Sequence, residues 1–321
     1  MGSVPRRPGE SPRIKLTRPI LRRTLRYARA KYFSSPDVVA IGIGTKFKRR
    51  SATSNHHSIQ FFVVRKKSEK NLRTNRLPKY MVARGPGGSL LRTLRIATDV
   101  ISVGRVEAAC GAGASIAGGG GQLGVATLMF RDKQAAQGES FLLTCAHVAG
   151  DVNTAMQHDL MAGCDPATMP FARTVALARV QGDTLKYDVA LAKVLRPLAS
   201  GEDMVVDGMP IKLTSLLASH AIRPSDQYQC RFPVSNTSSG DVASSSGTAL
   251  VTYGGAECVV ENAFVLRAAI APGDSGGLIY SGNTAVGIAF ARSEEGWTWF
   301  HALGDALQHA IALYGTPLRC L

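Results

Sequence analysis

Short apolar runs, separated by polar and glycine-rich turns, cover most of the chain after about residue 36. Runs of this length that are rich in β-branched residues predict β-strands. Two of them, VVAIGIGTKF and SIQFFVVRKK, flank the polar loop RRSATSNHH and predict a hairpin or strand pair. Eight more follow beyond residue 122, namely GVATLMF, SFLLTCAHV, YDVALAKV, MPIKLTSLL, GTALVTY, NAFVLRAAI, GGLIYSG and TAVGIAFA. Regularly spaced short strands indicate an antiparallel sandwich or barrel.

Helical spacing is found near both ends of the chain. The first helix is basic and amphipathic, with its apolar positions at Ile20, Leu21, Leu25, Ala28 and Phe33. The second is predicted from Leu303 to Tyr314. The residues before the first helix combine Pro, Arg, Gly and Ser with few apolar side chains, which predicts a disordered tail.

A glycine-rich stretch, GAGASIAGGGGQ at 111–122, predicts a flexible boundary between two parts of the chain. The predicted organisation is a basic tail with a short helix (1–35), a basic β-rich module (36–105), a Gly-rich linker (106–122) and a larger β domain (123–321).

Charge differs sharply between the two halves. Residues 1–105 contain 25 Lys and Arg against 4 acids, a net charge of +21, whereas residues 106–321 contain 13 against 19, a net charge of −6. A basic module of this kind favours an acidic protein or a nucleic acid as its partner. A solvated basic surface without a specific partner is the simpler alternative.

The composition also bears on the compartment. There is no uncharged apolar run of about 18 residues, so we expect no membrane span, and the arginine-rich start lacks the apolar stretch of a secretory signal. The six cysteines stand singly, without the paired spacing of zinc or redox sites. We therefore expect a cytoplasmic protein with free thiols and with neither a metal nor a cofactor.

Three polar residues in apolar surroundings are the candidates for chemistry. Ser275 lies in APGDSGGLIY, a pattern that suits either a turn residue or a nucleophile. A serine hydroxyl is a weak nucleophile near neutral pH, so catalysis needs a general base and a group that orients this base. His147 ends the run SFLLTCAHV, and Asp188 lies inside LKYDVALAKV, where a carboxylate needs a donor such as an imidazole N–H. Together they predict a nucleophile, a base and an orienting acid.

In this order along the chain, the motifs TCAH (144–147), DVAL (188–191) and GDSGG (273–277) resemble the chymotrypsin-like serine protease family. The resemblance covers about residues 122–321. The segment VVAIGIGTKF is similar to an N-terminal module of some cytosolic bacterial trypsin-like peptidases.

The resemblance implies a mainly β fold, with two antiparallel six-stranded β-barrels, a C-terminal helix and a small basic strand-rich domain in front. It places His147 and Asp188 on the first barrel and Ser275 on the second, and it implies a serine endopeptidase that cleaves a protein or peptide substrate through an acyl-enzyme. The backbone N–H groups of Gly273 and Ser275 are expected to hold the oxyanion.

The resemblance also implies a substrate pocket. Ala269, six residues before the serine, is expected at the base of the pocket for the side chain preceding the cut bond. The strand Phe290, Ala291, Arg292 is expected to pair with the substrate backbone. Because Ala269 carries no charge, we expect a small or medium apolar side chain in the pocket rather than lysine or arginine. An acidic side chain is the alternative, because of Arg292.

The chain also departs from the digestive members of the family. It has no Arg-Ile-Val-Gly-Gly activation sequence, so we do not expect Asp274 to pair with a newly cut N-terminus. The Arg105–Val106 bond is an alternative cut site near the glycine-rich stretch.

Two other functions are compatible with these motifs. The G-x-S-x-G pattern at 273–277 also occurs in α/β-hydrolase esterases, although that fold needs its acid and histidine after the serine and a parallel sheet. Because only 46 residues follow Ser275 and the preceding segments are strands, the chain does not suit that fold, and we expect His301 and His309 to be surface or helix residues. The second alternative is a catalytically silent protease-like binding module, in which the basic N-terminal half carries the recognition.

Overall fold

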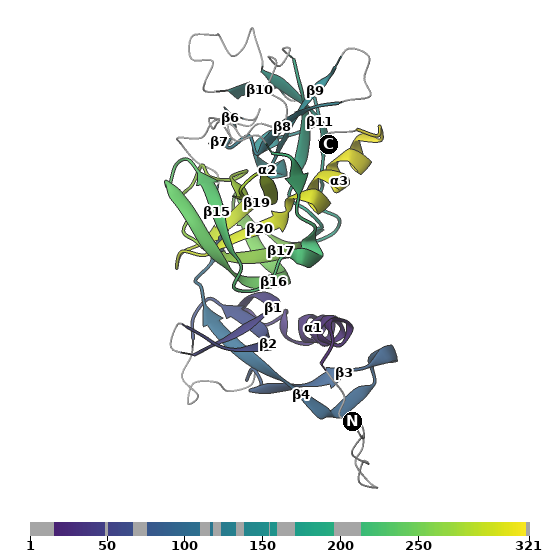
Figure 1. Cartoon of the computed structure of the whole chain (residues 1–321), viewed down its shortest axis with the longest axis vertical. Helices are drawn as coiled ribbons and strands as arrows, with labels where there is room; N and C mark the ends of the chain where they lie inside the picture. The colour runs from purple at the N-terminus through teal and green to yellow at the C-terminus, as the bar shows by residue number, and fades with distance from the viewer. Residues whose placement is uncertain are drawn as a thin grey trace, which may run out of the picture.

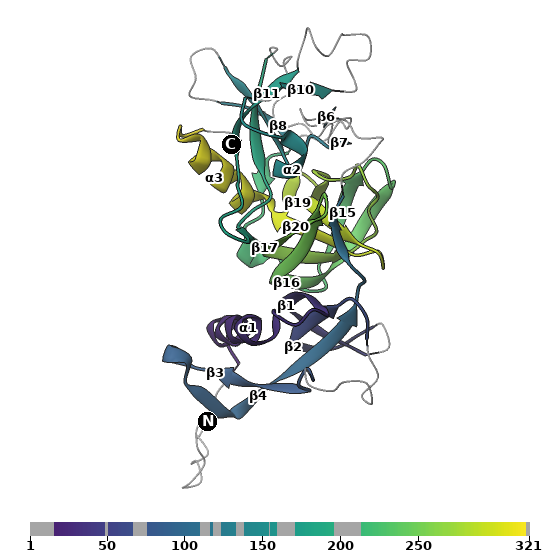
Figure 2. The same cartoon turned by 180° about the vertical axis from the view of Figure 1, so that it is seen from behind.

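The computed structural model describes residues 16–48, 51–66, 76–109, 116–117, 123–132, 138–153, 155–158, 171–195 and 213–318. These residues form three units that follow one another along the long axis of the molecule (Figure 1). The N-terminal strands and helix lie at one end, a barrel-like unit built from the C-terminal strands lies in the middle, and a second sheet lies at the other end; the view from behind shows the same order (Figure 2). The predicted tail up to residue 15 lies outside the described residues.

The N-terminal unit consists of one helix on a small sheet. The predicted helix is confirmed as α1 (Arg18–Tyr32), and the predicted strand pair as antiparallel β1 (Val38–Lys48) and β2 (Ser51–Val63). The segment expected to be a loop is shorter than predicted, because β2 already begins at Ser51. The sheet continues with β4 (Leu90–Ser102), which pairs with β2, and then with β3 (Tyr80–Arg84); the short helix η2 (Pro86–Gly88) connects β3 to β4. The apolar face of α1 packs on β1 and β3.

The middle unit is a ring of six antiparallel strands. The order of pairing is β16, β17, β20, β19, β18, β15 and back to β16. These strands are β15 (Gln227–Phe232), β16 (Thr237–Tyr253), β17 (Ala256–Arg267), β18 (Leu278–Ser281), β19 (Thr284–Ser293) and β20 (Thr298–Ala302). Three short elements flank them, β12 (Thr184–Leu185), β14 (Ser215–Leu216) and the helix η4 (Ser219–Ala221).

The third unit is a seven-stranded sheet in the order β7, β6, β10, β11, β13, β9, β8. Its strands are β6 (Ile116–Ala117), β7 (Leu123–Gly124), β8 (Leu128–Arg131), β9 (Ser140–Thr144), β10 (Ala155–His158), β11 (Ala172–Leu177) and β13 (Ala190–Val194). The C-terminal helix is confirmed as α3 (Leu303–Tyr314), which packs against β11 and β13 of this sheet and against β19 and β20 of the ring. The mainly β fold closed by a C-terminal helix is thus as predicted.

Two pairings join parts of the chain that the sequence pattern separates. β1 pairs with β16, from Ala40 opposite Ala249 to Gly44 opposite Ser244, so the N-terminal sheet continues into the ring. Inside the predicted linker, β5 (Val106–Ala108) pairs antiparallel with β19 and parallel with β16. The start of the linker is therefore a strand inserted between two strands of the ring.

Among the described residues, no helix is both long enough and apolar enough to cross a bilayer.

Candidate active site

The ends of two neighbouring strands place His147 beside Asp188. β9 and β13 pair antiparallel with Thr144 opposite Ala190. His147 follows three residues after Thr144, in the single turn of α2 (Ala146–Ala149), and Asp188 precedes Ala190 by two residues. Because the strands run in opposite directions, both residues lie at the same edge of the sheet. His147 Nδ1 lies 2.5 Å from Asp188 Oδ2, and the His147 backbone N–H donates to Asp188 Oδ1 at 3.2 Å.

Ser275 lies beside His147, although it belongs to the ring of six strands. It lies in the turn before β18, between Gly273 and Gly276, whose φ values of 103° and 92° are in the region that favours glycine. A Cβ atom on Gly276 would lie 2.1 Å from the carbonyl oxygen of Val125. The turn thus packs directly on the link between β7 and β8 of the seven-stranded sheet, and Ser275 Oγ lies 2.9 Å from His147 Nε2. The structure brings the three predicted residues into one hydrogen-bonded chain.

Asp188 is fully buried and well supplied with donors. Its Oδ2 atom also accepts a hydrogen bond from the Tyr253 hydroxyl at 2.8 Å. Burial alone raises the pKa of this carboxyl, but the nearby His147 and the Tyr253 hydrogen bond outweigh burial and hold the pKa of Asp188 below its ordinary value. A carboxylate that stays ionised fixes the Nδ1–H tautomer of His147 and leaves Nε2 free to accept a proton from Ser275.

The prediction for His301 is wrong. Instead of lying at the surface or in a helix, His301 lies on β20 and is fully buried. Its Nε2 atom accepts the backbone N–H of Asp188 at 2.9 Å, and its Nδ1 atom lies 3.2 Å from the Asn262 carbonyl oxygen. Burial lowers the pKa of His301 to about 4, so the ring is neutral at neutral pH. It holds the backbone of Asp188, whereas His309 lies in helix α3 as expected.

The two expected oxyanion donors both point at one carbonyl oxygen of the chain itself. The backbone N–H groups of Gly273 and Ser275 donate to the carbonyl oxygen of Ala109 at 2.7 and 3.1 Å. Ala109 directly follows β5 and is fully buried, as is Ser275. Two convergent backbone donors beside a serine hydroxyl form the geometry that stabilises negative charge on a carbonyl oxygen under attack.

The strand expected to pair with a substrate backbone pairs instead with residues 107–109 of the chain itself. Phe290 accepts the backbone N–H of Ala109 at 3.4 Å, Ala291 lies opposite Ala108, and Arg292 lies opposite Glu107. The Arg292 guanidinium forms an ion pair with Glu107 at 3.5 Å. Arg292 thus contacts a residue two positions before Ala109.

Ala269, expected at the base of the substrate pocket, is exposed. Its carbonyl accepts the Thr237 hydroxyl at 2.7 Å. The neighbours Ala268 and Ile270 belong instead to the buried hydrophobic cluster that includes Ala109.

Asp274 is buried and makes three hydrogen bonds to backbone N–H groups. Its donors are Ala271 at 2.9 Å, Val234 at 2.8 Å and Ser235 at 3.1 Å. These three donors hold the turn that carries Gly273 and Ser275, so the carboxylate is satisfied without a cut N-terminus.

Cys145, His147 and Asp188 place possible metal ligands within 4.8 Å of one another. The His147 Nδ1 atom and the Asp188 carboxylate are already bonded to each other, and Cys145 Sγ lies 3.2 Å from the Ala289 carbonyl oxygen. The arrangement is therefore one for proton transfer rather than for metal coordination.

No protein-family model matches this sequence, and no curated protein matches it in sequence. Similar solved structures include the Nocardiopsis protease NAPase, which is 19% identical over 61% of this chain and 94% of that one, with a TM-score of 0.40. Others are a glutamic-acid-specific serine protease (17% identical, 64% and 98% covered, TM-score 0.44) and Cellulomonas bogoriensis chymotrypsin (17% identical, 65% and 97% covered, TM-score 0.39). The likeness is distant, so the function has to be argued from the site itself.

Proposed function

We propose that this protein is a serine endopeptidase of the chymotrypsin-like class. The single observation that carries the proposal is the hydrogen-bonded chain from Asp188 through His147 to Ser275, which ends beside a carbonyl oxygen held by two backbone N–H groups. Nucleophile, base and orienting acid are thus joined by hydrogen bonds, and the two oxyanion donors converge on one carbonyl oxygen, as acyl transfer requires.

The geometry supports the following reaction. Ser275 Oγ attacks the carbonyl carbon, His147 Nε2 takes the hydroxyl proton, and the buried carboxylate of Asp188 stabilises the resulting imidazolium. The N–H groups of Gly273 and Ser275 stabilise the oxyanion. His147 then gives its proton to the leaving amine, and a water molecule hydrolyses the acyl-enzyme by the same steps in reverse.

The contacts of β5 support a cleavage preference. The fully buried Ala109 favours a small apolar side chain before the cut bond, in line with the uncharged pocket expected from the sequence. Arg292 forms an ion pair with Glu107, which lies two positions before Ala109. We therefore expect the preferred substrate to carry its acidic side chain two positions before the residue that precedes the cut bond, rather than in the pocket itself. Profiling with a mixed peptide library tests both preferences, and cleavage mainly after lysine or arginine would contradict the first.

The α/β-hydrolase alternative has no support from the chain topology. His147 and Asp188 both precede Ser275 in the sequence, and β18, which follows Ser275, pairs antiparallel with both of its neighbours.

Labelling with a fluorophosphonate, followed by peptide mapping, tests the proposal. We expect modification at Ser275 and its loss in Ser275→Ala, with exposed Ser281→Ala as the matched control that still labels. The same labelling is repeated on the variant Ala109→Trp. A tryptophan side chain cannot occupy the buried position of Ala109, so the chain's own strand no longer competes with the reagent for the site. Absence of label at Ser275 in both chains would leave a silent binding module as the better account.

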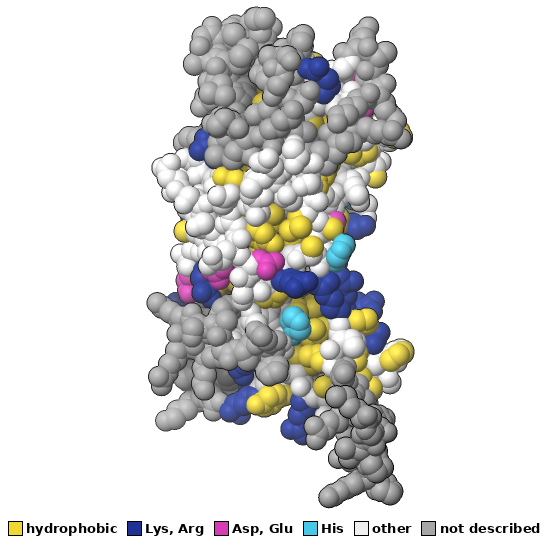
Figure 3. Space-filling model, viewed as in Figure 1, with side chains coloured by type: hydrophobic (Ala, Val, Ile, Leu, Met, Phe, Trp, Pro, Cys, Tyr) yellow, Lys and Arg dark blue, Asp and Glu magenta, His cyan; other side chains and the backbone are white. Residues whose placement is uncertain are grey.

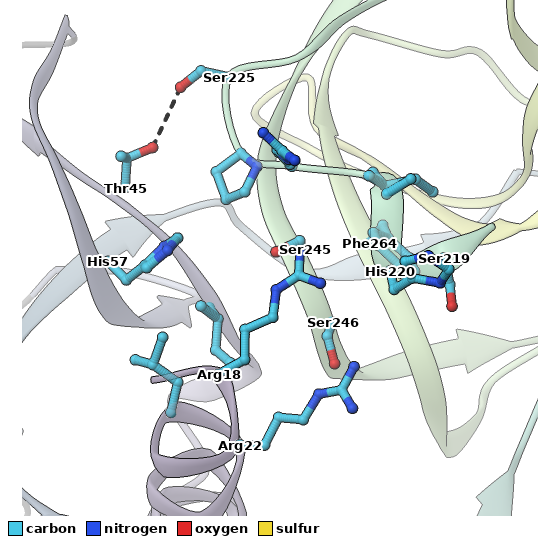
Figure 4. Close-up of a pocket in the computed structure, with 16 residues that line it drawn as sticks. Arg18, Arg22, Thr45, His57, Ser219, His220, Ser225, Ser245, Ser246 and Phe264 are labelled. Atoms are coloured by element: carbon cyan, nitrogen blue, oxygen red, sulfur yellow. Dashed lines mark hydrogen bonds between the residues drawn. The ribbon is translucent and has the colours of Figure 1, made fainter. Parts of the chain in front are cut away.

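A second candidate function rests on a groove between the N-terminal unit and the ring. The cavity measures about 770 Å³, and its lining includes the cations Arg18, Arg22 and Arg223, together with His57 and His220. Arg18 and Arg22 extend from α1 toward Ser245 and Ser246 of β16 (Figure 4). No acidic side chain is among the described residues that line it.

The charge around this groove is positive. Lys and Arg side chains gather on this face at the level where the two units meet (Figure 3). Burial, and then the charge of Arg18, lower the pKa of His57. We propose that the groove binds phosphate groups, with single-stranded nucleic acid as the partner, because guanidinium and hydroxyl groups together suit phosphate oxygens.

Binding of a fluorescent single-stranded oligonucleotide to the full chain tests this second proposal. We expect Arg18→Ala with Arg22→Ala to weaken binding and to reduce the slope of log K against log salt by about 1.4, at about 0.7 per lost phosphate contact. Arg26→Ala, exposed on the same helix outside the groove, is the control. Equal binding by all chains, or stronger competition by polyglutamate than by unlabelled oligonucleotide, would contradict the proposal.

A further inference from the structure

The strand that follows the N-terminal unit lies in the candidate active site as a peptide substrate would. β5 extends the edge of β19 antiparallel, with Val106 opposite Ser293, Glu107 opposite Arg292 and Ala108 opposite Ala291. The next residue, Ala109, donates its N–H to Phe290. Its carbonyl oxygen lies 2.7 Å from the backbone nitrogen of Gly273 and 3.1 Å from that of Ser275.

Burial agrees with this placement. Ala109 and Ser275 have no exposed surface, and the Ala109 side chain belongs to the hydrophobic cluster of the ring. Residues just before the strand anchor it as well, since the Glu295 backbone N–H donates to the Val103 carbonyl at 3.3 Å and the Ser102 hydroxyl donates to the Glu295 carboxylate at 2.9 Å. The strand is therefore held along its length, and the site has no room for another peptide backbone while it is bound.

The bond that belongs to the held carbonyl is the one between Ala109 and Cys110 in the sequence. We propose that the chain cleaves this bond itself, in an intramolecular reaction. The inference rests on the proposed protease function and names the first substrate of that site. Because enzyme and substrate are one chain, the reacting groups are brought together without an association step.

The reaction balances with water as the only added reactant. Ser275 Oγ bonds to the Ala109 carbonyl carbon while His147 takes the hydroxyl proton. The bond to the Cys110 nitrogen breaks as that nitrogen takes the proton from His147 and becomes a new amino terminus. Water then attacks the ester, Ser275 recovers its proton through His147, and Ala109 is left with a carboxyl group.

The structure also indicates what happens to the products. The segment ending at Ala109 remains paired through β1 and β16, and Arg29 of α1 forms an ion pair with Glu261 of β17 at 2.9 Å. The two pieces are therefore expected to stay together after cleavage, with Ala109 still in the site as a bound product. Release of this strand would then control access for other substrates.

The inferred cut differs from the Arg105–Val106 bond considered from the sequence. That bond lies four residues before the held carbonyl, and the Arg105 carbonyl oxygen accepts the backbone N–H of Glu294 at 3.4 Å instead of those of Gly273 and Ser275.

Intact-mass measurement and N-terminal sequencing of the purified full chain test the inference. We expect fragments 1–109 and 110–321 that elute together, with a new N-terminus at Cys110. The first-order rate should not change with protein concentration. Ser275→Ala is expected to stay whole, and adding wild-type protein is not expected to cut it.

Two variants separate docking of the strand from catalysis. Ala109→Trp is expected to stop self-cleavage and to raise fluorophosphonate labelling of Ser275 by at least about tenfold, because the bound strand no longer blocks the site. Glu107→Lys replaces the ion pair with Arg292 by repulsion and is expected to slow self-cleavage, whereas Ser281→Ala, at an exposed position outside β5, leaves it nearly unchanged.

The failure of this inference is distinguishable from the failure of the protease function. A wild-type chain that labels at Ser275 but keeps the Ala109–Cys110 bond intact would overturn self-cleavage and leave the protease proposal standing. Cleavage of that bond in Ser275→Ala, or at a rate that rises with concentration, would also overturn it. No labelling at Ser275 in either the wild type or Ala109→Trp would overturn both.

Discussion

The Nε2 atom of His301 accepts the backbone N–H of Asp188 at 2.9 Å, although the two residues are 113 positions apart in the sequence. The His301 ring also stacks on Phe290, with 4.3 Å between ring centroids. A neutral imidazole thus connects the acid of the candidate triad to the strand that holds β5.

This relationship predicts acid sensitivity of the fold. Because the pKa of His301 is lowered to about 4, the unfolded chain takes up a proton at this residue between about pH 6.5 and 4 while the folded chain does not. Stability is therefore lost as pH falls through this window, by roughly 3 kcal/mol at about 1.4 kcal/mol per pH unit. Urea unfolding at pH 7 and pH 4.5 measures the loss. His301→Gln should reduce it, exposed His220→Gln should not, and an equal loss in all three chains would show that His301 is not its source.

Tyr253 is predicted to be a positioning residue for the triad. Tyr253→Phe removes the hydroxyl that donates to Asp188 Oδ2, a hydrogen bond to a charged group worth about 1.5–3 kcal/mol. We expect the rate of fluorophosphonate labelling at Ser275 to fall by about tenfold or more, and the pH at which labelling is half-maximal to shift. A purely structural role would lower the melting temperature while leaving the half-maximal pH unchanged.

Asp274 is predicted to keep the Gly273 N–H in place. In Asp274→Asn an amide group faces three backbone donors, so one N–H loses its acceptor at a cost of about 1–3 kcal/mol. We expect lower thermal stability and at least about tenfold slower labelling of Ser275. Asp305→Asn, in the first turn of α3, is the control and should change stability by about 0.5 kcal/mol. Unchanged labelling in Asp274→Asn would show that the turn is held by other contacts.

The features that could be predicted from the sequence are those that depend on residues close together in the chain. Short apolar runs predict the strands, and polar residues at the end of one run and inside another identify His147 and Asp188 as residues that need partners. The contacts of Tyr253 and His301 could not be predicted in this way, because they join strands 65 and 113 residues away from Asp188. Residues 106–109 were counted as linker because a glycine-rich stretch follows them, yet they pair with β19. Such pairing depends on the free edge of a distant strand, which periodicity does not reveal.

The most direct test of the central claim is the rate of phosphonate labelling at Ser275 in chains that all carry Ala109→Trp, so that the chain's own strand does not compete. If His147, oriented by Asp188, activates Ser275, then Asp188→Asn should slow labelling by about 10⁴-fold, while Asp183→Asn, a nearby acid outside the hydrogen-bonded chain, should leave the rate nearly unchanged. Equal rates in all three chains, or a larger loss in Asp183→Asn, would contradict the account.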